Sequence, residues 1–490
     1  MPGTTTPARS WISAATAGDR RRWVALVVVC LGQLMIVLDA TIVNVALPSI
    51  QRDLRFSQAN LTWVVDAYLI SFGSFLLMGG RLGDLVGRKK VFLGGLVVFT
   101  AASLLCGLAD AQGLLIAARF VQGLGGAVTS AVILALIVTE FPAPSERAKA
   151  MSVYTFVAVG GGSIGLVLGG VLTQSIDWHW IFLVNLPIGI AALALGWLLI
   201  DETEGIGLRE GVDVLGSVLV TVAMMIGVYA IVTSSDAGLG SAHTLGFGGL
   251  SLALLTAFGV LQTRLANPIM PPHVLRLRGL LGSSAVRGLL VTGMFGAFFL
   301  GALYFEHVLG YSALQTGLAF LPQTLVVGVL SLGITAWLMG RFGAMRILVP
   351  GLALMTCGLL ALAQAGTHAA YFPAIFIPLL LTGLGAGISF MPLLTIAMAN
   401  VPARDAGLAS GLVNVSMQMA AAVGLAVLGV IATHRTKTLL AGGDAPAGAL
   451  TSGYHLAFLI GAGCVALGIV VALVVLRRSA PAAAANPRDP

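Results

Sequence analysis

The sequence predicts an all-α membrane protein with fourteen transmembrane helices, on the strength of its composition, its apolar stretches and the placement of its basic residues. Hydrophobic residues make up 58% of the 490 residues and charged residues only 9%, and the mean hydropathy is +1.00. A soluble domain carries about 25% charge, so this composition excludes a soluble enzyme and a disordered chain. The apolar stretches are far longer than the roughly ten-residue strands of a membrane barrel, which favours helices.

Fourteen apolar stretches are each long enough to cross a hydrocarbon core of about 30 Å as a helix. They are 23–47, 61–80, 91–109, 113–138, 150–173, 180–200, 213–234, 244–263, 283–307, 312–339, 347–365, 371–399, 409–433 and 454–476. The first is too long for the apolar region of a cleaved signal peptide, so we expect a retained signal anchor. All four cysteines lie inside these stretches without metal-ligand spacing, and we expect no metal and no cofactor.

The basic residues orient this map. With the N-terminus placed in the cytoplasm, nearly all Lys and Arg residues fall on the cytoplasmic side. Arg52, Arg55, Arg435 and Lys437 fall on the opposite side, and Arg119 alone is left inside a stretch. Cytoplasmic loops of membrane proteins show this excess of positive charge. Both termini are therefore expected in the cytoplasm.

Short sequence marks recur at an offset of 260 residues, which predicts a duplicated architecture. The marks are Gly80-Arg81-Leu82-Gly83 with Gly340-Arg341-Phe342-Gly343, Gly123-Leu124-Gly125 with Gly383-Leu384-Gly385, and Pro142-Ala143 with Pro402-Ala403. The alternative is that glycine-rich helices resemble one another anyway. The predicted organisation is a cytoplasmic tail (1–22), a six-helix bundle (23–200), two extra helices with linkers (201–282), a second six-helix bundle (283–476) and a disordered cytoplasmic tail (477–490).

The loop after the second stretch combines glycines with a basic run. Gly80, Gly83 and Gly87 surround Asp84, and Arg88 begins the basic triplet. Gly83 and Gly87 permit a tight turn, and Asp84 and Arg88 stand four residues apart, as a helix-end ion pair requires. An ordinary basic loop is the alternative; we expect a loop that takes part in gating.

This loop resembles the signature loop of the major facilitator superfamily, and other segments resemble its fourteen-spanner branch of drug:proton antiporters. These segments are Leu38–Pro48, the residues Trp63, Asp66, Ala67 and Tyr68, Arg119–Gly123, and Tyr311–Gly317. The resemblance implies the major facilitator fold and multidrug-type export in exchange for protons. The sequence departs from the family at Leu166, where the antiporter motif has proline, and at His179, where arginine is common.

Ionisable residues inside apolar stretches are costly, by about 2.5–3.5 kcal/mol each, and therefore indicate function. Asp39 and Arg119 should face one interior and interact, and we assign them to proton coupling, a role that the resemblance also implies. A purely structural ion pair is the alternative. Asp66, near the start of the second stretch, is a candidate second protonation or cation site, with surface exposure as the alternative.

A glycine face marks the fifth stretch. Gly161, Gly165 and Gly169 recur at four-residue spacing, which lets helices approach closely and slide, although simple packing also produces such patterns. Leu166 in place of proline weakens the case for antiport and leaves a proton-independent facilitator or importer as the alternative function.

Polar side chains inside the stretches suggest a substrate cavity. The candidates are Asn44, Tyr68, Gln122, Glu306, Gln323, Asn414 and Gln418. Hydrogen bonding between helices is the alternative for the amides, and a solvated helix end is the alternative for Glu306. Together they fit a mostly apolar, promiscuous pocket with a few polar groups.

The predicted function is that of a secondary active exporter, not an enzyme. No phosphate-binding loop, HExxH motif or nucleophile elbow occurs, and no loop is long enough for a catalytic domain. We expect a monomer in a bacterial cytoplasmic membrane that exchanges protons for a lipophilic small molecule and binds no nucleic acid. A membrane receptor or scaffold without transport is the rival from another class, and the sequence names no substrate.

Overall fold

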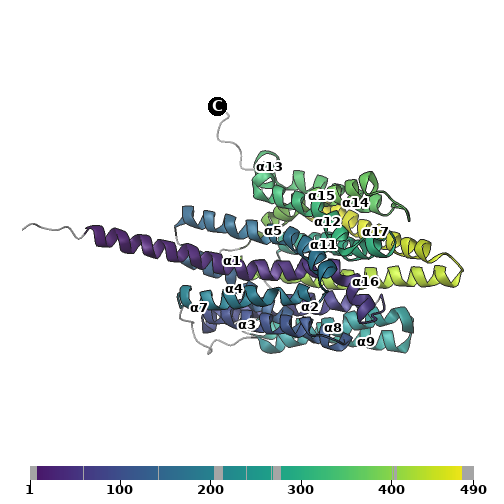
Figure 1. Cartoon of the computed structure of the whole chain (residues 1–490), viewed down its shortest axis with the longest axis horizontal. Coiled ribbons are helices and arrows are strands. Elements are labelled where there is room, and N and C mark those ends of the chain that lie inside the picture. Colours follow the sequence, from purple (N-terminus) through teal and green to yellow (C-terminus); the bar gives the residue numbers. More distant parts are fainter. Residues whose placement is uncertain are drawn as a thin grey trace, which may run out of the picture.

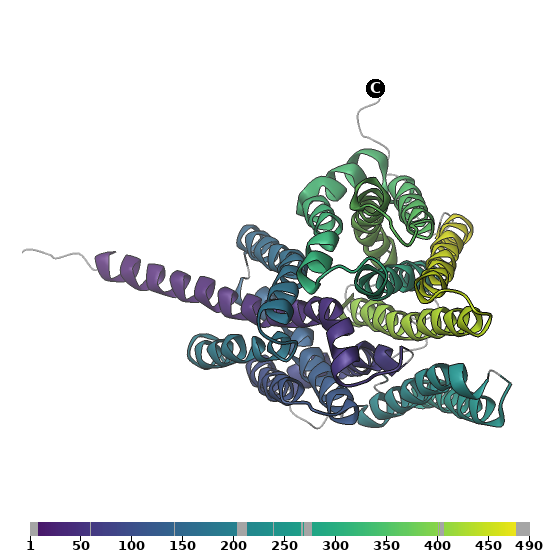
Figure 2. The same cartoon turned by 45° about the vertical axis from the view of Figure 1, so that its right-hand side comes forward.

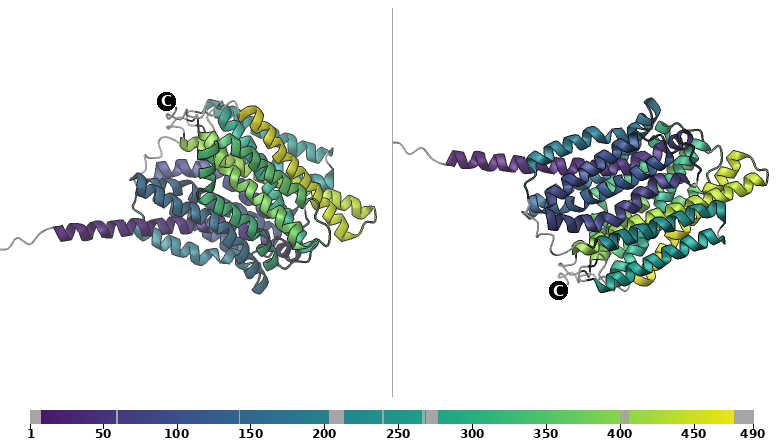
Figure 3. Two further views of the ribbon diagram at one scale, coloured as in Figure 1. Left: turned by 90° about the horizontal axis from the view of Figure 1, so that it is seen from above. Right: turned by 90° about the horizontal axis from the view of Figure 1, so that it is seen from below.

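Long helices packed side by side make up the molecule (Figure 1). The computed structural model describes residues 8–58, 60–141, 143–202, 213–238, 240–265, 268, 277–399, 401 and 406–476. Over these ranges all regular structure is helical. Figure 3 shows that most helices run roughly parallel, and that the start of the first helix projects beyond the others.

A first group of helices covers the N-terminal part of the chain. Its members are α1 (Ala8–Asp53), α2 (Trp63–Val86), α3 (Arg88–Gly107), α4 (Gln112–Glu140), α5 (Pro144–Ser175), α6 (Trp180–Leu183) and α7 (Asn185–Leu199). A short 3-10 turn, Asn60–Thr62, leads into α2. Since α1 begins at Ala8, this helix extends into the segment predicted as a polar tail.

A second group covers the C-terminal part, and a helix pair connects the two groups. The pair is α8 (Val214–Ala237) and α9 (Ala242–Arg264); the second group is α11 (Arg278–His307), α12 (Ala313–Val329), α13 (Thr335–Phe342), α14 (Ala344–Leu362), α15 (Phe376–Met398), α16 (Ala406–Ala441) and α17 (Pro446–Val471). Single π turns precede α13 and α15 and follow α17. The pair forms a hairpin at the lower right of Figure 2, where α8 lies against α2 and α16.

Each of the fourteen apolar stretches falls on one helix or on two or three consecutive helical pieces. Counted over the residues that the structure describes, ten helices are long and apolar enough to cross a membrane, and three shorter apolar helices accompany them. The predicted tail at 477–490 lies outside the described residues, so its predicted disorder stays a prediction.

Side-chain burial is distributed as a lipid environment requires. Large apolar side chains such as Trp197, Leu198 and Leu252 are exposed, whereas the charged side chains of Asp39 and Arg119 are buried. A soluble protein would hide such apolar surface, but lipid tails solvate it. The helices therefore present apolar faces outward and enclose polar groups between them.

The two groups repeat one packing arrangement. Gly125 of α4 lies against Gly95 and Phe99 of α3, and Gly385 of α15 lies against Gly351 and Met355 of α14. In both pairs a side chain at the glycine position would collide with backbone of the facing helix. Small residues permit this close approach.

The packing corrects the predicted repeat in one respect. The turn glycines with positive φ are Gly87, between α2 and α3, and Gly343, between α13 and α14. Gly343 therefore corresponds to Gly87, not to Gly83, and the offset of α3 and α14 is 256 residues. It returns to 260 at α4 and α15 because the connection from α14 to the π turn that leads into α15 is four residues longer than the connection from α3 to α4. Pro142 and Pro402 lie outside the described residues.

Replacing Gly125 by alanine should destabilise the protein by about 1–3 kcal/mol, because the added methyl group would lie 2.5 Å from the backbone nitrogen of Phe99. Thermal unfolding of the purified protein measures the effect. Gly113→Ala in the same helix is the matched control, since that position faces open space. Equal losses in both variants would contradict the proposed close contact of α3 and α4.

Candidate functional site

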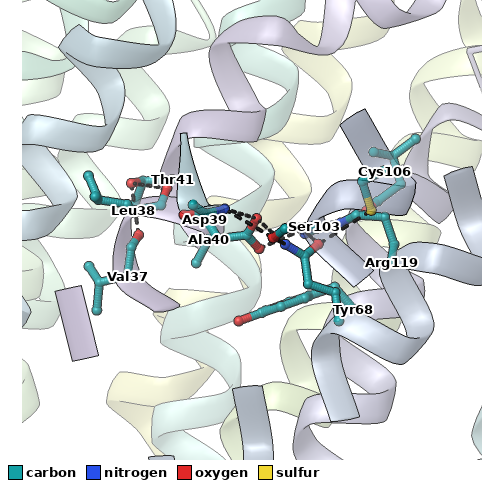
Figure 4. Close-up of polar contacts among 12 residues, drawn as sticks. Val37, Leu38, Asp39, Ala40, Thr41, Tyr68, Ser103, Cys106 and Arg119 are labelled. Atoms are coloured by element: carbon teal, nitrogen blue, oxygen red, sulfur yellow. Dashed lines mark hydrogen bonds and ion pairs between the residues drawn. The ribbon is translucent and has the colours of Figure 1, made fainter. Parts of the chain in front are cut away.

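A buried ion pair joins α1 to α4. Arg119 Nη1 lies 2.6 Å from Asp39 Oδ2, and the side chains are only 1% and 0% exposed. The two residues are 80 positions apart in the sequence, and their contact lies at the centre of Figure 4. The two charged residues that the sequence analysis expected to interact therefore do so.

Three amide and hydroxyl side chains extend this ion pair into a network. Gln122 accepts a hydrogen bond from Arg119 (2.7 Å) and donates to Asp39 Oδ1 (2.8 Å) and to Ser103 (2.6 Å). Asn185, at the start of α7, also reaches Asp39 Oδ1 (3.5 Å) and Ser103 (3.3 Å). Both carboxylate oxygens of Asp39 are thus hydrogen-bonded, which offsets part of the cost of removing the charge from water.

Aromatic rings and a backbone carbonyl hold the Arg119 guanidinium. Arg119 Nε donates to the carbonyl of Val64 at 2.9 Å. The guanidinium carbon lies 4.4 Å from the ring centroid of Tyr68 and 5.6 Å from that of Phe182. An aromatic face attracts a desolvated cation. The Tyr68 hydroxyl is buried and has no hydrogen-bond partner among the described residues.

Sequence reasoning found Asp39, Arg119, Gln122 and Tyr68 but missed Ser103 and Asn185. The charged residues carry a clear signal because of their cost in an apolar stretch. A serine inside a helix, or an asparagine at the start of one, is common and carries no comparable signal.

Asp66 lies in the first turn of α2 and is fully buried. Its carboxylate oxygens form no well-aligned hydrogen bond with a described residue, although the Thr62 side chain, one turn earlier, lies close enough to interact. Thr62 in turn packs beside Gly429 of α16. The alternative of a solvent-exposed Asp66 is therefore wrong, and this carboxyl lies close to the contact between the two groups.

The glycine face of α5 packs against α1. Gly161 faces Leu34, and Gly169 faces Ile42. Gly165 lies over the carbonyl of Leu38 and the side chain of Thr41, the residues on either side of the Asp39–Ala40 pair.

A different face of α5 contacts the second group. Gly170 lies against Ala313 and Leu314 at the start of α12, and Gly317 of α12 lies against the carbonyl of Leu166. Hence α5 touches the helix that carries Asp39 on one side and the second group on the other.

The loop between α2 and α3 is anchored within the first group. Gly87, with φ of 111°, makes the turn, whereas Gly83 lies inside α2 against Val132 of α4. The expectation that both glycines form the turn is therefore corrected. Arg88 donates to Thr139 of α4 at 2.6 Å, and Gly80 faces open space. The side chain of Asp84 lies outside the described residues, so its pairing with Arg88 stays a prediction.

The seven predicted cavity residues are not gathered in one place by the described contacts. Tyr68 and Gln122 touch the ion pair, while Asn44 bonds to the carbonyls of Ala40 and Thr41 in its own helix. Gln418 of α16 packs near Gly73 of α2, at the junction of the two groups.

The remaining three lie in the second group. Gln323 is buried on α12 and Asn414 is half-buried on α16. Glu306 closes α11, half-buried, and its Oε1 has no hydrogen-bond partner among described residues.

A model of the Major Facilitator Superfamily matches residues 29–425. The chain belongs to the major facilitator superfamily. This confirms the family resemblance carried by the sequence motifs, and it makes the chain a multi-pass membrane transporter and not an enzyme.

Relatives within the superfamily are resistance and export proteins. The puromycin resistance protein pur8 of Streptomyces alboniger is 38% identical over 473 residues, covering 95% of this chain and 93% of that protein. The cephamycin export protein CmcT of Amycolatopsis lactamdurans is 38% identical over 407 residues, covering 82% and 84%. The tetracenomycin C resistance and export protein of Streptomyces glaucescens is 31% identical over 419 residues, covering 85% and 77%.

Solved structures share the fold at low sequence identity. A bacterial homologue of the human lysosomal transporter Spinster, in an inward-facing and unoccupied conformation, matches with a TM-score of 0.67 and 15% identity over 95% of this chain and 99% of that chain. The POT family transporter PepTSo matches with a TM-score of 0.66 and 15% identity over 93% of this chain and 98% of that chain. These matches show the major facilitator fold and nothing about substrates.

Replacing Arg119 by methionine should destabilise this transporter by about 3–5 kcal/mol, because Asp39 would lose its cation while staying buried. The double variant Asp39→Asn with Arg119→Met should lose less, since no charge is left buried. Thermal unfolding of wild type, Arg119→Met, Asp39→Asn and the double variant forms a double-mutant cycle, with Arg341→Met at an exposed position as control. Additive losses in the cycle would contradict a direct interaction.

Asp177, in the loop before α6, should make the stability of the protein depend on pH. Partial burial works to raise the pKa of Asp177, but hydrogen bonds from the backbone N–H and the ring of His179 outweigh it and lower the pKa. A lowered pKa means that ionised Asp177 stabilises the fold above its unfolded pKa, about 3.9, and that this contribution is lost as the pH falls through the folded pKa. Asp177→Asn should therefore lower the melting temperature at pH 7, and its difference from wild type should shrink toward pH 3.

Melting curves from pH 3 to pH 7 test this effect, with the exposed Asp444→Asn as the matched control. A difference that is constant over this range would show that the ionised carboxylate of Asp177 is not the stabilising form.

Proposed function

We propose that this transporter exports hydrophobic or amphipathic drugs or natural products in exchange for protons, by alternating access. Relatives named for puromycin resistance and cephamycin export support small-molecule antibiotics as the cargo class. The observation that carries the coupling mechanism is the fully buried Asp39–Arg119 ion pair.

The proposed topology has fourteen transmembrane helices as six, two and six, with both termini in the cytoplasm. Its support is the helical character of all fourteen apolar stretches and the asymmetry of the basic residues. We further propose a monomer in a bacterial cytoplasmic membrane, in which the α1–α7 and α11–α17 groups act as the two moving bundles.

Asp39 is the proposed proton carrier. In its ionised form the carboxylate accepts hydrogen bonds from Arg119, Gln122 and Asn185. Binding a proton removes the negative charge that opposes the Arg119 guanidinium and turns one acceptor oxygen into a donor. The network must then rearrange, so the protonation state of Asp39 selects between two arrangements of α1 and α4.

Helix α5 provides a physical link from this rearrangement to the second group. Its Gly165 lies over the carbonyl of Leu38, next to Asp39, and its Leu166 carbonyl lies against Gly317 of α12. A shift of α1 that follows protonation would press on α5, which in turn contacts the second group. The glycines make such a contact close enough to transmit small displacements.

Asp66 is the proposed second proton or cation site. Its buried carboxylate lacks a strong hydrogen-bond partner among described residues, and Thr62 beside it packs at Gly429 of α16. A carboxyl at this position would respond to separation of α2 from α16. The remaining predicted polar residues, Asn44, Gln323, Asn414 and Gln418, are proposed to offer hydrogen bonds to substrate.

The proton gradient is sufficient for useful export. At about 140 mV one proton supplies roughly 3.2 kcal/mol, which supports about a 200-fold gradient of a neutral compound.

Proton-independent facilitation is the second candidate function. Leu166 stands where the antiporter motif has proline, and α5 runs as one helix from Pro144 to Ser175. An unbroken α5 lacks the bend that a proline would introduce, so the coupling of this helix to proton movement needs a direct test.

Inverted membrane vesicles containing a pH-sensitive dye separate the two candidates. After energisation and addition of lipophilic cations or neutral antibiotics, wild type should release protons from the vesicle lumen, and Asp39→Asn should not, because it carries no ionisable group at this position. Asp444→Asn, an exposed carboxylate in the connection between α16 and α17, is the control. Labelled substrate that crosses without any proton movement in wild type would overturn antiport and favour facilitation.

A further inference from the structure

A second arginine lies inside an apolar helix, contrary to the expectation that Arg119 is alone. Arg287 is nine residues into α11, whose whole length is a candidate membrane span. Nine residues of helix correspond to about 13 Å. Arg287 therefore lies inside the helix, and not among the cytoplasmic loop residues with which it was counted in the sequence.

Arg287 has no acidic partner among the residues that the structure describes. Its Nε is buried without a hydrogen-bond partner, and it forms no ion pair with a described residue. The helices α12 to α17 contain no Asp or Glu. Glu306 lies nineteen residues further along α11, about 28 Å away.

Helix α16 offers no acid beside Arg287. Gly288 of α11 lies level with Ala420 of α16, and α16 contains no Asp or Glu. Among the described residues of the second group, the charge of Arg287 is thus uncompensated.

Two hydroxyl groups accompany this cation. Ser283 and Ser284 precede Arg287 by four and three residues, so they lie one turn away on the same side of α11. Both are buried, and neither hydroxyl has a hydrogen-bond partner in the described structure. Ser283, Ser284 and Arg287 therefore offer hydrogen-bond donors for which the described residues supply no acceptor.

An aromatic ring completes the arrangement. The Arg287 guanidinium carbon lies 5.3 Å from the ring centroid of Phe390 on α15, and both side chains are only partly buried. The ring occupies one face of the guanidinium and leaves its N–H edge available. A planar guanidinium edge matches the two oxygens of a carboxylate, while the exposed part of Phe390 offers an apolar surface.

We propose that Arg287, with Ser284 and Phe390, forms a subsite for the carboxylate of an anionic amphiphile. The subsite deepens the proposed export function, on which it rests, by naming a substrate class. The carboxylate oxygens accept hydrogen bonds from Arg287 and Ser284, and the apolar body of the ligand lies against Phe390. An uncompensated cation in an apolar helix is costly, and the bound anion removes this cost.

The test compares 1-pyrenebutyrate with 1-pyrenebutyramide, which share an apolar body and differ in charge. Binding is measured by fluorescence with the full-length protein in phosphatidylcholine nanodiscs, after subtraction of empty discs. Wild type should prefer the acid at least about tenfold, because a charge-assisted hydrogen bond adds to the apolar contact. In Arg287→Met the preference should fall to about one, and Arg287→Lys should retain part of it.

Two further variants keep the test decisive. Ser284→Ala should reduce the acid preference about threefold, and it carries the test if Arg287→Met fails to insert. Arg341→Met is the matched control, since Arg341 lies exposed at the end of α13 over Trp337, and it should keep the full preference. Equal binding of acid and amide by wild type, or no binding of either, overturns the subsite.

Lipid composition and transport separate the remaining explanations. A preference that persists in nanodiscs containing phosphatidylglycerol supports a carboxylate subsite, whereas its loss assigns Arg287 to a lipid phosphate and overturns the proposal. Export of the amide from vesicles tests the proposed function on its own. Export without acid preference overturns only the subsite, and acid preference without export of either probe overturns only the exporter.

Discussion

The cost of keeping charge in an apolar interior governs this structure. Asp39 and Arg119 sit between helices where water cannot solvate them, and a lone charge there would cost several kcal/mol. The fold meets this cost by placing Gln122, Asn185 and the Val64 carbonyl around the pair. The proposal of proton coupling rests on the same balance, because a proton on Asp39 would remove the negative charge to which Arg119 and Gln122 are bonded.

Close contacts between helices surround the Asp39–Arg119 ion pair. Helices in lipid gain little from apolar burial, so they associate through small residues and interhelical hydrogen bonds. Gly165 brings α5 onto α1 beside Asp39, and Gly317 brings α12 onto α5. A glycine at such a contact allows the two backbones to approach closely, which is the basis for proposing that displacements pass between these helices. The path from the ion pair to the second group therefore needs only three helices.

Much of the fold and of the ion pair could be predicted from the sequence, because long apolar stretches and charged residues inside them are distinctive in a membrane protein. Fourteen apolar stretches located the helices, and an acid and an arginine inside such stretches located the ion pair. Asn185 and Ser103 were not predicted as site residues, because a neutral polar residue costs little free energy in a helix and occurs there for many reasons. The repeat was found, but its offset was wrong by one helical turn at Gly343, since glycines four residues apart align equally well and only the turn geometry at Gly87 distinguishes them. Arg287 lies within the predicted stretch 283–307, but it was counted with the cytoplasmic loops because it stands close to the beginning of that stretch.

The duplicated architecture makes the difference between the two groups informative. Helices α1 and α4 hold an acid and an arginine that neutralise each other. Their counterparts by position in the repeat, α11 and α15, hold an arginine over a phenylalanine, and the acid of α11, Glu306, lies nineteen residues away from that arginine. Because the two groups share a fold, the fold alone does not explain why one has an ion pair and the other a cation over an aromatic ring. We infer that the two arrangements serve different functions. The neutral pair suits a group that exchanges a proton within the protein, whereas the open cation suits a group that receives its counter-charge from outside. One half of the molecule would then manage the proton and the other half the cargo, and α5, which touches both, is the element through which each would sense the other.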